Sequence, residues 1–246
     1  MNIKRLIAAA TVATFAAGAA MADGHAVRIG TEGAYPPYNF INDSGELDGF
    51  EIEFGNMLCA HAKLECTWVK NDWDSIIPNL VSGNYDVIMA GMSITAERDE
   101  VIDFTQGYIP PTYSFYVAPA GANLDLTSAD TVIAAQVNTI QAGHVAASGA
   151  TVLEFATPDE TVAAVRNGEA DAVLADDDYL KPVVADSNGE LAVIDKTRLG
   201  GGVGLGIRES DGDLRGKLDA AIAHFKESGE LNTLLAKWFG DEPPQW

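Results

Sequence analysis

Basic residues are scarce in this sequence of 246 residues, because 15 Lys and Arg stand against 36 Asp and Glu and give a formal net charge of −21. Nucleic acids are bound by clustered Lys and Arg, so we expect no nucleic-acid partner. The same shortage argues against residence on an anionic membrane surface. Hydrophobic residues still make up 47% of the chain, which is enough to bury a core.

Long apolar runs are absent after the N-terminal segment. Lys4 and Arg5 are followed by an uncharged run over residues 6–20 and then by small residues before Asp23. This pattern predicts a secretory signal peptide over residues 1–22, whose removal would change the formal charge to −23. A transmembrane anchor is the alternative, but the run is short and rich in Ala compared with the ~20 apolar residues of a span. We therefore expect an exported, periplasmic protein.

Cysteine is almost missing, with Cys59 and Cys66 as the only pair. An oxidising compartment favours a disulfide between them. A metal site is the alternative, but two cysteines and the nearby His61 fall short of four ligands. We expect a disulfide and no bound metal.

Signatures of catalysis are missing too. The sequence contains no nucleophile elbow, no Walker loop and no His-Glu-x-x-His helix. His61, His144 and His224 lie in predicted helices without a partner at metal-ligand spacing, so we expect them to face solvent. The sequence therefore predicts no catalytic residue, no enzyme activity and no cofactor.

Strands and helices alternate along the rest of the chain, which predicts α/β layers with mainly parallel sheets. The motif Thr-Pro-Asp-Glu at 157–160 is a capping box that begins one helix. Breaks that contain Pro or Gly near 110 and near 200 suggest two lobes joined by two crossings of the chain. The expected strands cover 27–31, 66–70, 85–89, 113–118, 131–135, 152–155, 172–175, 191–194 and 203–207, and the longer helices 50–61, 140–147, 157–167, 176–184, 213–227 and 230–239.

One segment, residues 89–98, suggests an anion site. A buried strand ends in small residues, turns, and begins a short helix that carries Arg98 in its first turn. Free backbone N–H groups beside a guanidinium suit a carboxylate. The alternative is that Thr95 only caps the helix and that Arg98 pairs with Glu97 or Asp99 at the surface.

A series of short motifs runs along essentially the whole chain after residue 22: TEGAYPPYNF at 31–40, GELDGFEI at 45–52, WDSIIP at 73–78, SITAER at 93–98, DFT at 103–105, GEADA at 168–172 and KWF at 237–239. In this order they resemble the motifs of the periplasmic polar amino-acid-binding proteins. The two cysteines lie where the histidine and lysine/arginine/ornithine binders carry a disulfide, and Glu-Gly-Ala-Tyr at 32–35 also resembles the opine-binding branch.

The resemblance implies an α/β, two-lobed type II periplasmic binding protein fold with a ligand cleft between the lobes. Residues 23–110 and 206–246 would form lobe one, and residues 111–205 lobe two. The implied partners are a free amino acid or close derivative and the membrane permease of an ABC importer, which the protein would serve as a monomer.

The resemblance also implies roles for individual residues. Arg98 would grip the ligand α-carboxylate, helped by backbone N–H groups of Ser93 and Thr139. Asp176 would meet the α-ammonium, together with the Gly91 carbonyl and the Ser93 hydroxyl. Tyr35 and Trp73 would line the side-chain slot, with Glu32 at its far end. The ligand-binding set is Glu32, Tyr35, Trp73, Ala90, Gly91, Ser93, Arg98, Asn138, Thr139 and Asp176.

Some of these residues also have a purely structural explanation. Tyr35 and Trp73 are also explained as core aromatics, and Asp176 as part of a solvated acidic helix start at 176–178. The loop at 136–141 departs from the family, since relatives show Gly and small hydroxyl residues there. We expect Asn138 of this loop to add a side-chain amide to the ligand.

A cleft-facing Glu32 would need a cationic partner, and aromatic faces favour guanidinium over ammonium. We therefore expect a basic amino acid, arginine first, then ornithine, lysine, histidine or an opine. If Glu32 instead points to solvent, a neutral amino acid such as glutamine becomes the expected ligand.

Three classes of function compete. A binding protein is the leading prediction, and a periplasmic enzyme on the same scaffold, resembling cyclohexadienyl dehydratase, is the second. The sensor domain of a receptor is disfavoured, because no transmembrane or signalling segment follows Trp246.

Overall fold

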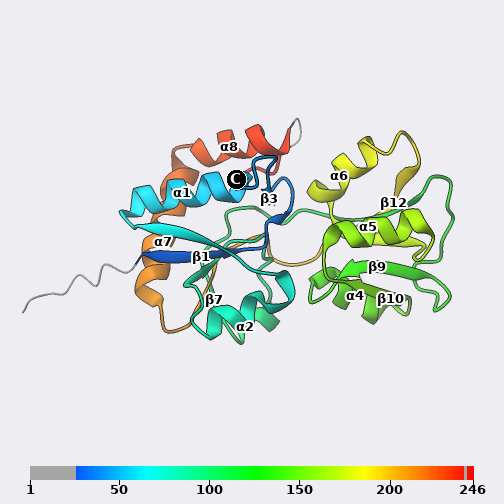
Figure 1. Ribbon diagram of the computed structural model, residues 1–246, viewed down its shortest axis with the longest axis horizontal. Helices are drawn as coiled ribbons and strands as arrows, with labels where there is room; N and C mark the ends of the chain where they lie inside the picture. The colour runs from blue at the N-terminus through cyan, green and yellow to red at the C-terminus, as the bar shows by residue number, and fades with distance from the viewer. Residues whose placement is uncertain (1–25, 241–242) are drawn as a thin grey trace, which may run out of the picture.

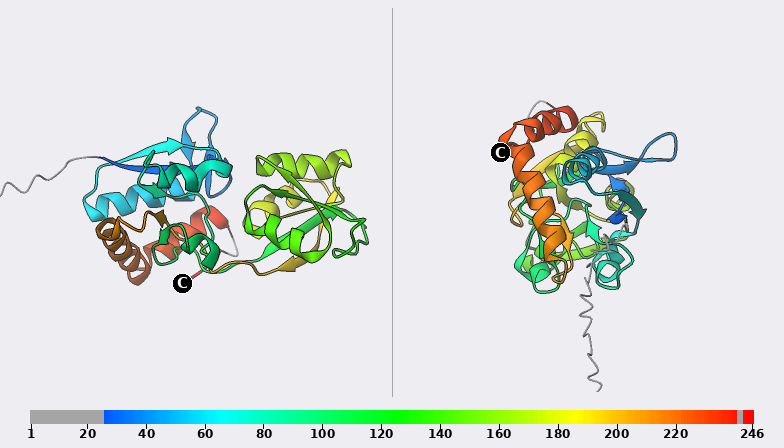
Figure 2. Two further views of the ribbon diagram at one scale, coloured as in Figure 1. Left: turned by 90° about the horizontal axis from the view of Figure 1, so that it is seen from below. Right: turned by 90° about the vertical axis from the view of Figure 1, so that its left-hand side faces the viewer.

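The computed structural model describes residues 26–240 and 243–246 and shows two lobes side by side (Figures 1 and 2). Each lobe contains a five-stranded sheet with helices on both faces. The two-lobed α/β fold expected from the sequence is confirmed. The predicted signal peptide lies outside the described residues. Within the described ranges, none of the helices combines the length and apolar character that crossing a membrane requires.

The sheet of the first lobe has the strand order β5-β1-β6-β13-β7. β1 is parallel to β5 and β6, whereas β13 is antiparallel to both of its neighbours. The strands are β1 (Val27–Thr31), β5 (Cys66–Lys70), β6 (Val87–Ile88), β7 (Asp103–Phe104) and β13 (Gly206–Ile207).

Helices cover both faces of this sheet, as the alternation of side chains along β6 requires. Val87 packs with α1 (Phe50–Ala62), α7 (Gly212–Glu227) and α8 (Glu230–Phe239). Ile88 points the other way and packs with α2 (Ile76–Val81), which follows the short 3₁₀ helix η1 (Trp73–Ser75). Figure 1 shows α1 and α8 on one side of this sheet and α2 on the other.

The sheet of the second lobe has the order β10-β9-β11-β8-β12. α5 and α6 pack on one face of it and α4 on the other. The elements are β8 (Ser114–Pro119), β9 (Val132–Gln136), α4 (Ile140–Ser148), β10 (Thr151–Phe155), α5 (Pro158–Asn167), β11 (Ala172–Asp176), α6 (Asp177–Ala185) and β12 (Leu191–Thr197).

Two crossings join the lobes. The chain leaves the first sheet after Phe104 and enters the second at Ser114, and it returns between Thr197 and Gly206. Ile109 and Val203 pair in a short antiparallel bridge, so the two crossings lie side by side. Lobe boundaries at 110/111 and 205/206 remain our proposal for this architecture.

The expectation of mainly parallel sheets is wrong. Each five-stranded sheet combines two parallel and two antiparallel pairs. Parallel strands that follow each other in the chain need a crossover connection, usually a helix. The strands next to the crossings join their sheets without such a helix from their own lobe, so they can run antiparallel to their neighbours. A small antiparallel sheet of β2 (Ala34–Tyr35), β3 (Asn39–Ile41) and β4 (Leu47–Asp48) was not expected, because its strands are too short to show alternation.

Local signals in the sequence were more reliable. The Cys59–Cys66 disulfide is confirmed, with 6.2 Å between the Cα atoms, and it joins the end of α1 to the start of β5. Closing so short a loop stabilises the fold by about 2–3 kcal/mol. The capping box of α5 is confirmed in both directions between Thr157 and Glu160. His61, His144 and His224 are not buried, as expected.

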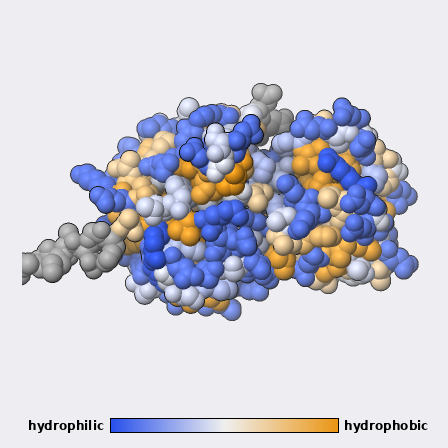
Figure 3. Space-filling view, in the orientation of Figure 1, coloured by the Kyte–Doolittle hydropathy of each residue, from blue (hydrophilic) through white to orange (hydrophobic). Residues whose placement is uncertain are grey.

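The surface carries the acidic excess of the chain. Hydrophilic residues are spread over both lobes on the face seen in Figure 3. The large hydrophobic side chains that are exposed in the described ranges are Ile41, Val81, Val101, Val193 and Trp246.

A polar cluster around Asp86 ties the first lobe together. The Asp86 carboxylate accepts hydrogen bonds from the Arg28 backbone and guanidinium at 3.0 Å and from Arg208 at 2.8 Å. Burial alone would raise the pKa of Asp86, but these donors outweigh it and lower the pKa to about 2. The carboxylate is thus bound in its charged form.

Asp86→Asn should lower the free energy of unfolding at pH 7 by about 1–2 kcal/mol, because the amide cannot replace a charged acceptor. A lowered pKa gives stability that is present above the unfolded value and is lost as the pH falls towards 2. The difference between wild type and variant, measured by urea denaturation, should therefore shrink below pH 4. Asp130→Asn, at an exposed position, is the matched control and should change stability little. Equal stability of Asp86→Asn and wild type at pH 7 would contradict this prediction.

Candidate functional site

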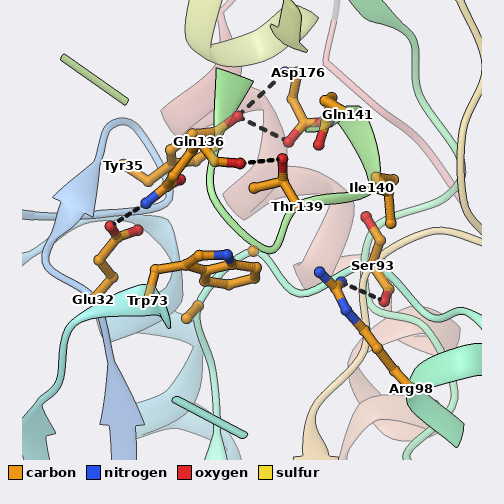
Figure 4. Close-up of a pocket in the computed structure, with 12 residues that line it drawn as sticks. Glu32, Tyr35, Trp73, Ser93, Arg98, Gln136, Thr139, Ile140, Gln141 and Asp176 are labelled. Atoms are coloured by element: carbon orange, nitrogen blue, oxygen red, sulfur yellow. Dashed lines mark hydrogen bonds between the residues drawn. The ribbon is translucent and has the colours of Figure 1, made fainter. Parts of the chain in front are cut away.

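A pocket lies between the two lobes (Figure 4). The first lobe contributes residues that follow β1 and β6, and the second contributes the loop after β9 and the end of β11. Carboxyl ends of strands at such a boundary are the usual place for ligands in α/β proteins. The lining residues are Glu32, Tyr35, Trp73, Ala90, Gly91, Ser93, Arg98, Gln136, Thr139, Ile140, Gln141 and Asp176.

Arg98 forms one end of the pocket. It lies in α3 (Ala96–Asp99), a single turn whose start is capped by the Thr95 side chain. The guanidinium donates to the backbone carbonyls of Ser93 at 2.9 Å and Asn138 at 3.2 Å, and it lies 5.3 Å from the centre of the Trp73 ring. Burial lowers the pKa of Arg98 to about 10, so the group stays charged at neutral pH. No carboxylate of the described residues forms an ion pair with Arg98, so the surface-pair alternative does not hold.

Asp176 approaches the pocket from the second lobe, at the point where β11 ends and α6 begins. Its carboxylate accepts hydrogen bonds from the Tyr35 hydroxyl at 2.9 Å and from the Gln141 amide at 2.8 Å. Burial raises the pKa of Asp176 to about 6, and the neighbouring Asp177 and Asp178 add to the effect. A solvated helix start therefore does not describe this residue.

Glu32 forms the other end, across Trp73 from Arg98 (Figure 4). Its side chain is buried, with 4% exposure, so it does not point to solvent. One carboxylate oxygen accepts a hydrogen bond of 2.6 Å from the Gln136 amide of the second lobe. Burial raises the pKa of Glu32 to about 7, although Gln136 and the more distant Lys70 act in the opposite direction.

Aromatic side chains form the walls between these ends. Tyr35 stacks on Tyr179 with 4.7 Å between ring centres and 15° between planes. Trp73 has 7% exposure, and its indole N–H has no hydrogen-bond partner among the described residues. Both rings line the pocket, so they are more than core aromatics.

The loop at Gly91 is held by a buried carboxylate behind it. Gly91 has φ +62°, a left-handed conformation that favours glycine, and its N–H donates to Glu51 at 2.7 Å. Glu51 also accepts hydrogen bonds from the Tyr108 hydroxyl and from Asn39, whose own oxygen accepts from the Gly33 N–H. This network holds the backbone at Gly33 and at Gly91.

The structure brings together all but one of the residues proposed from the sequence. Asn138 lies in the neighbouring, wider groove between α2 and α4 instead, because its backbone is left-handed (φ +58°) and its amide donates to the Asp74 carbonyl at 3.4 Å. Its expected amide contact with a ligand stays a prediction. Gln136, Ile140 and Gln141 line the pocket but were not proposed, although the atypical loop at 136–141 had marked the region.

Hydrogen bonds across the pocket join the two lobes. Glu32 meets Gln136, Tyr35 meets Asp176 in both directions, and the Tyr38 hydroxyl donates to Asp178 at 3.2 Å. The lobes are thus in contact around the pocket. Within the described part of the chain, no cluster of three or more His, Cys, Asp or Glu side chains could hold a metal ion.

Chemically, the pocket offers one fixed guanidinium and two fixed carboxylates.

Residues 27–241 match the family described as bacterial extracellular solute-binding proteins, family 3. The chain is 32% identical to the L-arginine-binding protein of Pseudomonas aeruginosa over 87% of each chain. It is 30% identical to the octopine-binding periplasmic protein of Rhizobium meliloti over 97% of this chain and 98% of that one.

Solved structures give a closer match. A periplasmic His/Glu/Gln/Arg/opine family-binding protein from Silicibacter pomeroyi, in complex with lysine, is 68% identical, with a TM-score of 0.86. The match covers 89% of this chain and 100% of that one. An ancestral amino acid-binding protein, described as a precursor of cyclohexadienyl dehydratase, is 27% identical over 88% of this chain and 96% of that one, with a TM-score of 0.78.

The raised pKa of Glu32 predicts how the stability of the ligand-free protein depends on pH. The folded protein binds this proton more tightly than the unfolded chain, so stability falls as the pH rises from about 4.5 to about 7. Glu32→Gln removes this titrating carboxyl. Between pH 4.5 and 7.5 the unfolding free energy of wild type should therefore fall by about 1–3 kcal/mol more than that of the variant. Urea denaturation at several pH values measures the difference. Parallel pH profiles of the two proteins would show that Glu32 is not buried as described.

Proposed function

The chain belongs to the bacterial extracellular solute-binding proteins of family 3, and from this premise we propose that it captures a basic amino acid in the periplasm. It would deliver this ligand, arginine or lysine, to the membrane permease of an ABC importer, and it would do so as a monomer. The relatives named for arginine and octopine and the lysine complex support this proposal.

The charge pattern of the pocket carries the proposal. A basic amino acid has one anionic group and two cationic groups, whereas the pocket offers one cation, Arg98, and two acids, Asp176 and Glu32. A neutral amino acid would leave one buried carboxylate without a counter-charge, which is costly. In the proposed pose the α-carboxylate meets Arg98, the α-ammonium meets Asp176 and the side-chain cation meets Glu32.

Backbone donors support the carboxylate end of this pose. Neither the Ser93 nor the Thr139 backbone N–H donates a hydrogen bond to another described residue. Thr139 is also the N-cap of α4, where free N–H groups and the helix dipole favour an anion. At the ammonium end, the Gly91 carbonyl and the Ser93 hydroxyl would complete the contacts of Asp176.

Capture would couple to closure of the cleft. Arg98 belongs to the first lobe and Asp176 to the second, so a zwitterion held by both binds the closed arrangement better than an open one. Such differential affinity is what shifts a population towards the closed state. The closed form is then the one that we propose the permease receives.

An enzyme on the same scaffold is the second candidate, because a carboxylate gripped by Arg98 also suits a dehydratase substrate. The similarity to the ancestral precursor of cyclohexadienyl dehydratase is the observation in its favour. Asp176 weighs against prephenate, which has no amine to place at an ammonium site, although arogenate does carry an α-ammonium. Incubation with prephenate and with arogenate tests this candidate, and we expect no product from either.

Arg98→Ala should weaken the binding of lysine and arginine by several hundredfold or more. A buried carboxylate that loses its only cationic partner costs about 3–5 kcal/mol, and each 1.4 kcal/mol is tenfold in affinity. Isothermal titration measures the loss, and Arg166→Ala, at an exposed position on α5, is the control. If Arg98→Ala retains near-normal affinity, the carboxylate anchor is assigned to the wrong residue.

Wild type should prefer arginine and lysine to glutamine, and Glu32→Gln should lose most of that preference while it still binds glutamine. The reason is that only the side-chain cation uses the Glu32 charge. Titrating both proteins with the three amino acids decides the matter. The proposal of a basic ligand would be contradicted if wild type prefers glutamine, or if Glu32→Gln binds arginine as tightly as wild type does.

A further inference from the structure

We propose that Gln136 determines the specificity for a cationic side chain: with Glu32 it forms a receptor, built from both lobes, for the charged end of the ligand. This inference rests on the proposed function and names a residue that the sequence did not single out. Gln136 is the last residue of β9, has 7% exposure and lines the pocket next to Glu32 (Figure 4).

The orientation of the Gln136 amide follows from its neighbours. Its nitrogen lies 2.6 Å from a Glu32 carboxylate oxygen and 3.0 Å from the Ala156 carbonyl oxygen. The Ala156 carbonyl can only accept a hydrogen bond, and so can the Glu32 carboxylate when it is ionised to receive a cation, so the NH₂ group faces both of them and the flipped amide is excluded. The two N–H donors of Gln136 are therefore used up.

The amide oxygen of Gln136 is left as a spare acceptor. It accepts no hydrogen bond from any described residue, and the second carboxylate oxygen of Glu32 accepts none either. One charged and one neutral acceptor thus lie at the same end of the pocket, one from each lobe. An ammonium brings three donors and a guanidinium five, so either cation can satisfy both acceptors together.

A neutral side chain suits this end poorly. A ureido or carboxamide group has fewer donors, and it brings a carbonyl oxygen towards two acceptors. Citrulline is the sharpest comparison, because it has the shape of arginine but carries an oxygen in place of one nitrogen and has no charge. The pair of acceptors should therefore separate arginine from citrulline, as sites that hydrogen-bond a ligand group reject analogues that lack it.

Gln136 also keeps Glu32 ready for a cation. Its hydrogen bond opposes the effect of burial on the Glu32 carboxylate, while Asp72 and Asp159 act with burial and Lys70 against it. Losing Gln136 would thus weaken the receptor twice, through the missing amide oxygen and through a less readily ionised Glu32.

A second glutamine in the same pocket provides a matched control. The Gln141 amide donates to Asp176 at 2.8 Å and to the Ser114 hydroxyl at 3.0 Å, and Gln141 has 5% exposure. It supports the proposed ammonium site, which every α-amino acid uses. The same substitution at the two positions should therefore have different effects on ligand preference.

The test is isothermal titration of wild type, Gln136→Leu and Gln141→Leu with arginine and citrulline. We expect wild type to prefer arginine by about a hundredfold or more, and Gln136→Leu to reduce this ratio by about tenfold, chiefly through weaker arginine binding. Gln141→Leu should weaken both ligands by similar factors and leave the ratio near that of wild type. Thermal unfolding of the ligand-free proteins checks that each is folded, and Gln136→Met, which keeps the side-chain length, replaces Gln136→Leu if that variant is not.

The outcomes separate the two proposals. An unchanged ratio in Gln136→Leu, or an equal loss for arginine and citrulline, would overturn the role of Gln136, because a merely structural residue would give that result. A wild type that binds neither arginine nor lysine would overturn the proposed function itself. A falling ratio in Gln136→Leu alone supports both.

Discussion

The pocket depends on three ionisable groups that are held away from water, Arg98, Asp176 and Glu32, and Arg98 forms no ion pair with a described carboxylate. Burial raises the pKa of Glu32 and Asp176 and lowers that of Arg98, so each group is disfavoured in its charged form. A ligand with the opposite charge pattern reverses all three effects at once. Because Arg98 and Glu32 lie on one lobe and Asp176 on the other, this compensation is available only when the lobes meet. Under the proposed function, recognition of the ligand and closure of the cleft would therefore be the same electrostatic event.

Hydrogen-bonded neighbours hold these three groups and the nearby backbone in place. Tyr35 and Gln141 hold Asp176, Gln136 holds Glu32, and Glu51 holds the backbone at Gly91 from behind. Each of these supports is a hydrogen bond whose donor or acceptor is largely buried, so a displaced partner would leave an unsatisfied polar atom. The polar ends of the pocket are thus held by hydrogen bonds, whereas its walls are formed by the aromatic rings of Tyr35 and Trp73. Such a combination suits a family whose members bind several related amino acids.

Local motifs and family resemblance predicted the fold and most of the pocket, because the signals are short in sequence. The capping box at Thr157, the cysteine pair and the helix start at Arg98 each depend on residues a few positions apart. Gln136 could not be found in this way, since its importance comes from Glu32, which lies 104 residues earlier in the chain. The left-handed backbone of Asn138, which lies outside this pocket, could not be recognised either in a loop without glycine. The mixed direction of the strands likewise depends on which distant segments pair, and periodicity does not report that.

The strand order has a consequence for the synthesis of the molecule. Among the described strands, β7 is hydrogen-bonded only to β13, and the intervening chain contains every strand of the second sheet. A polypeptide that emerges from its amino end can thus complete the second sheet from one continuous stretch, while β7 still lacks its neighbour. The position between β6 and β7 in the first sheet stays unfilled until Gly206 and Ile207 of β13 have been made. Pairing β13 with β7 then closes a long loop. The lobe that begins the chain is therefore the last to be finished.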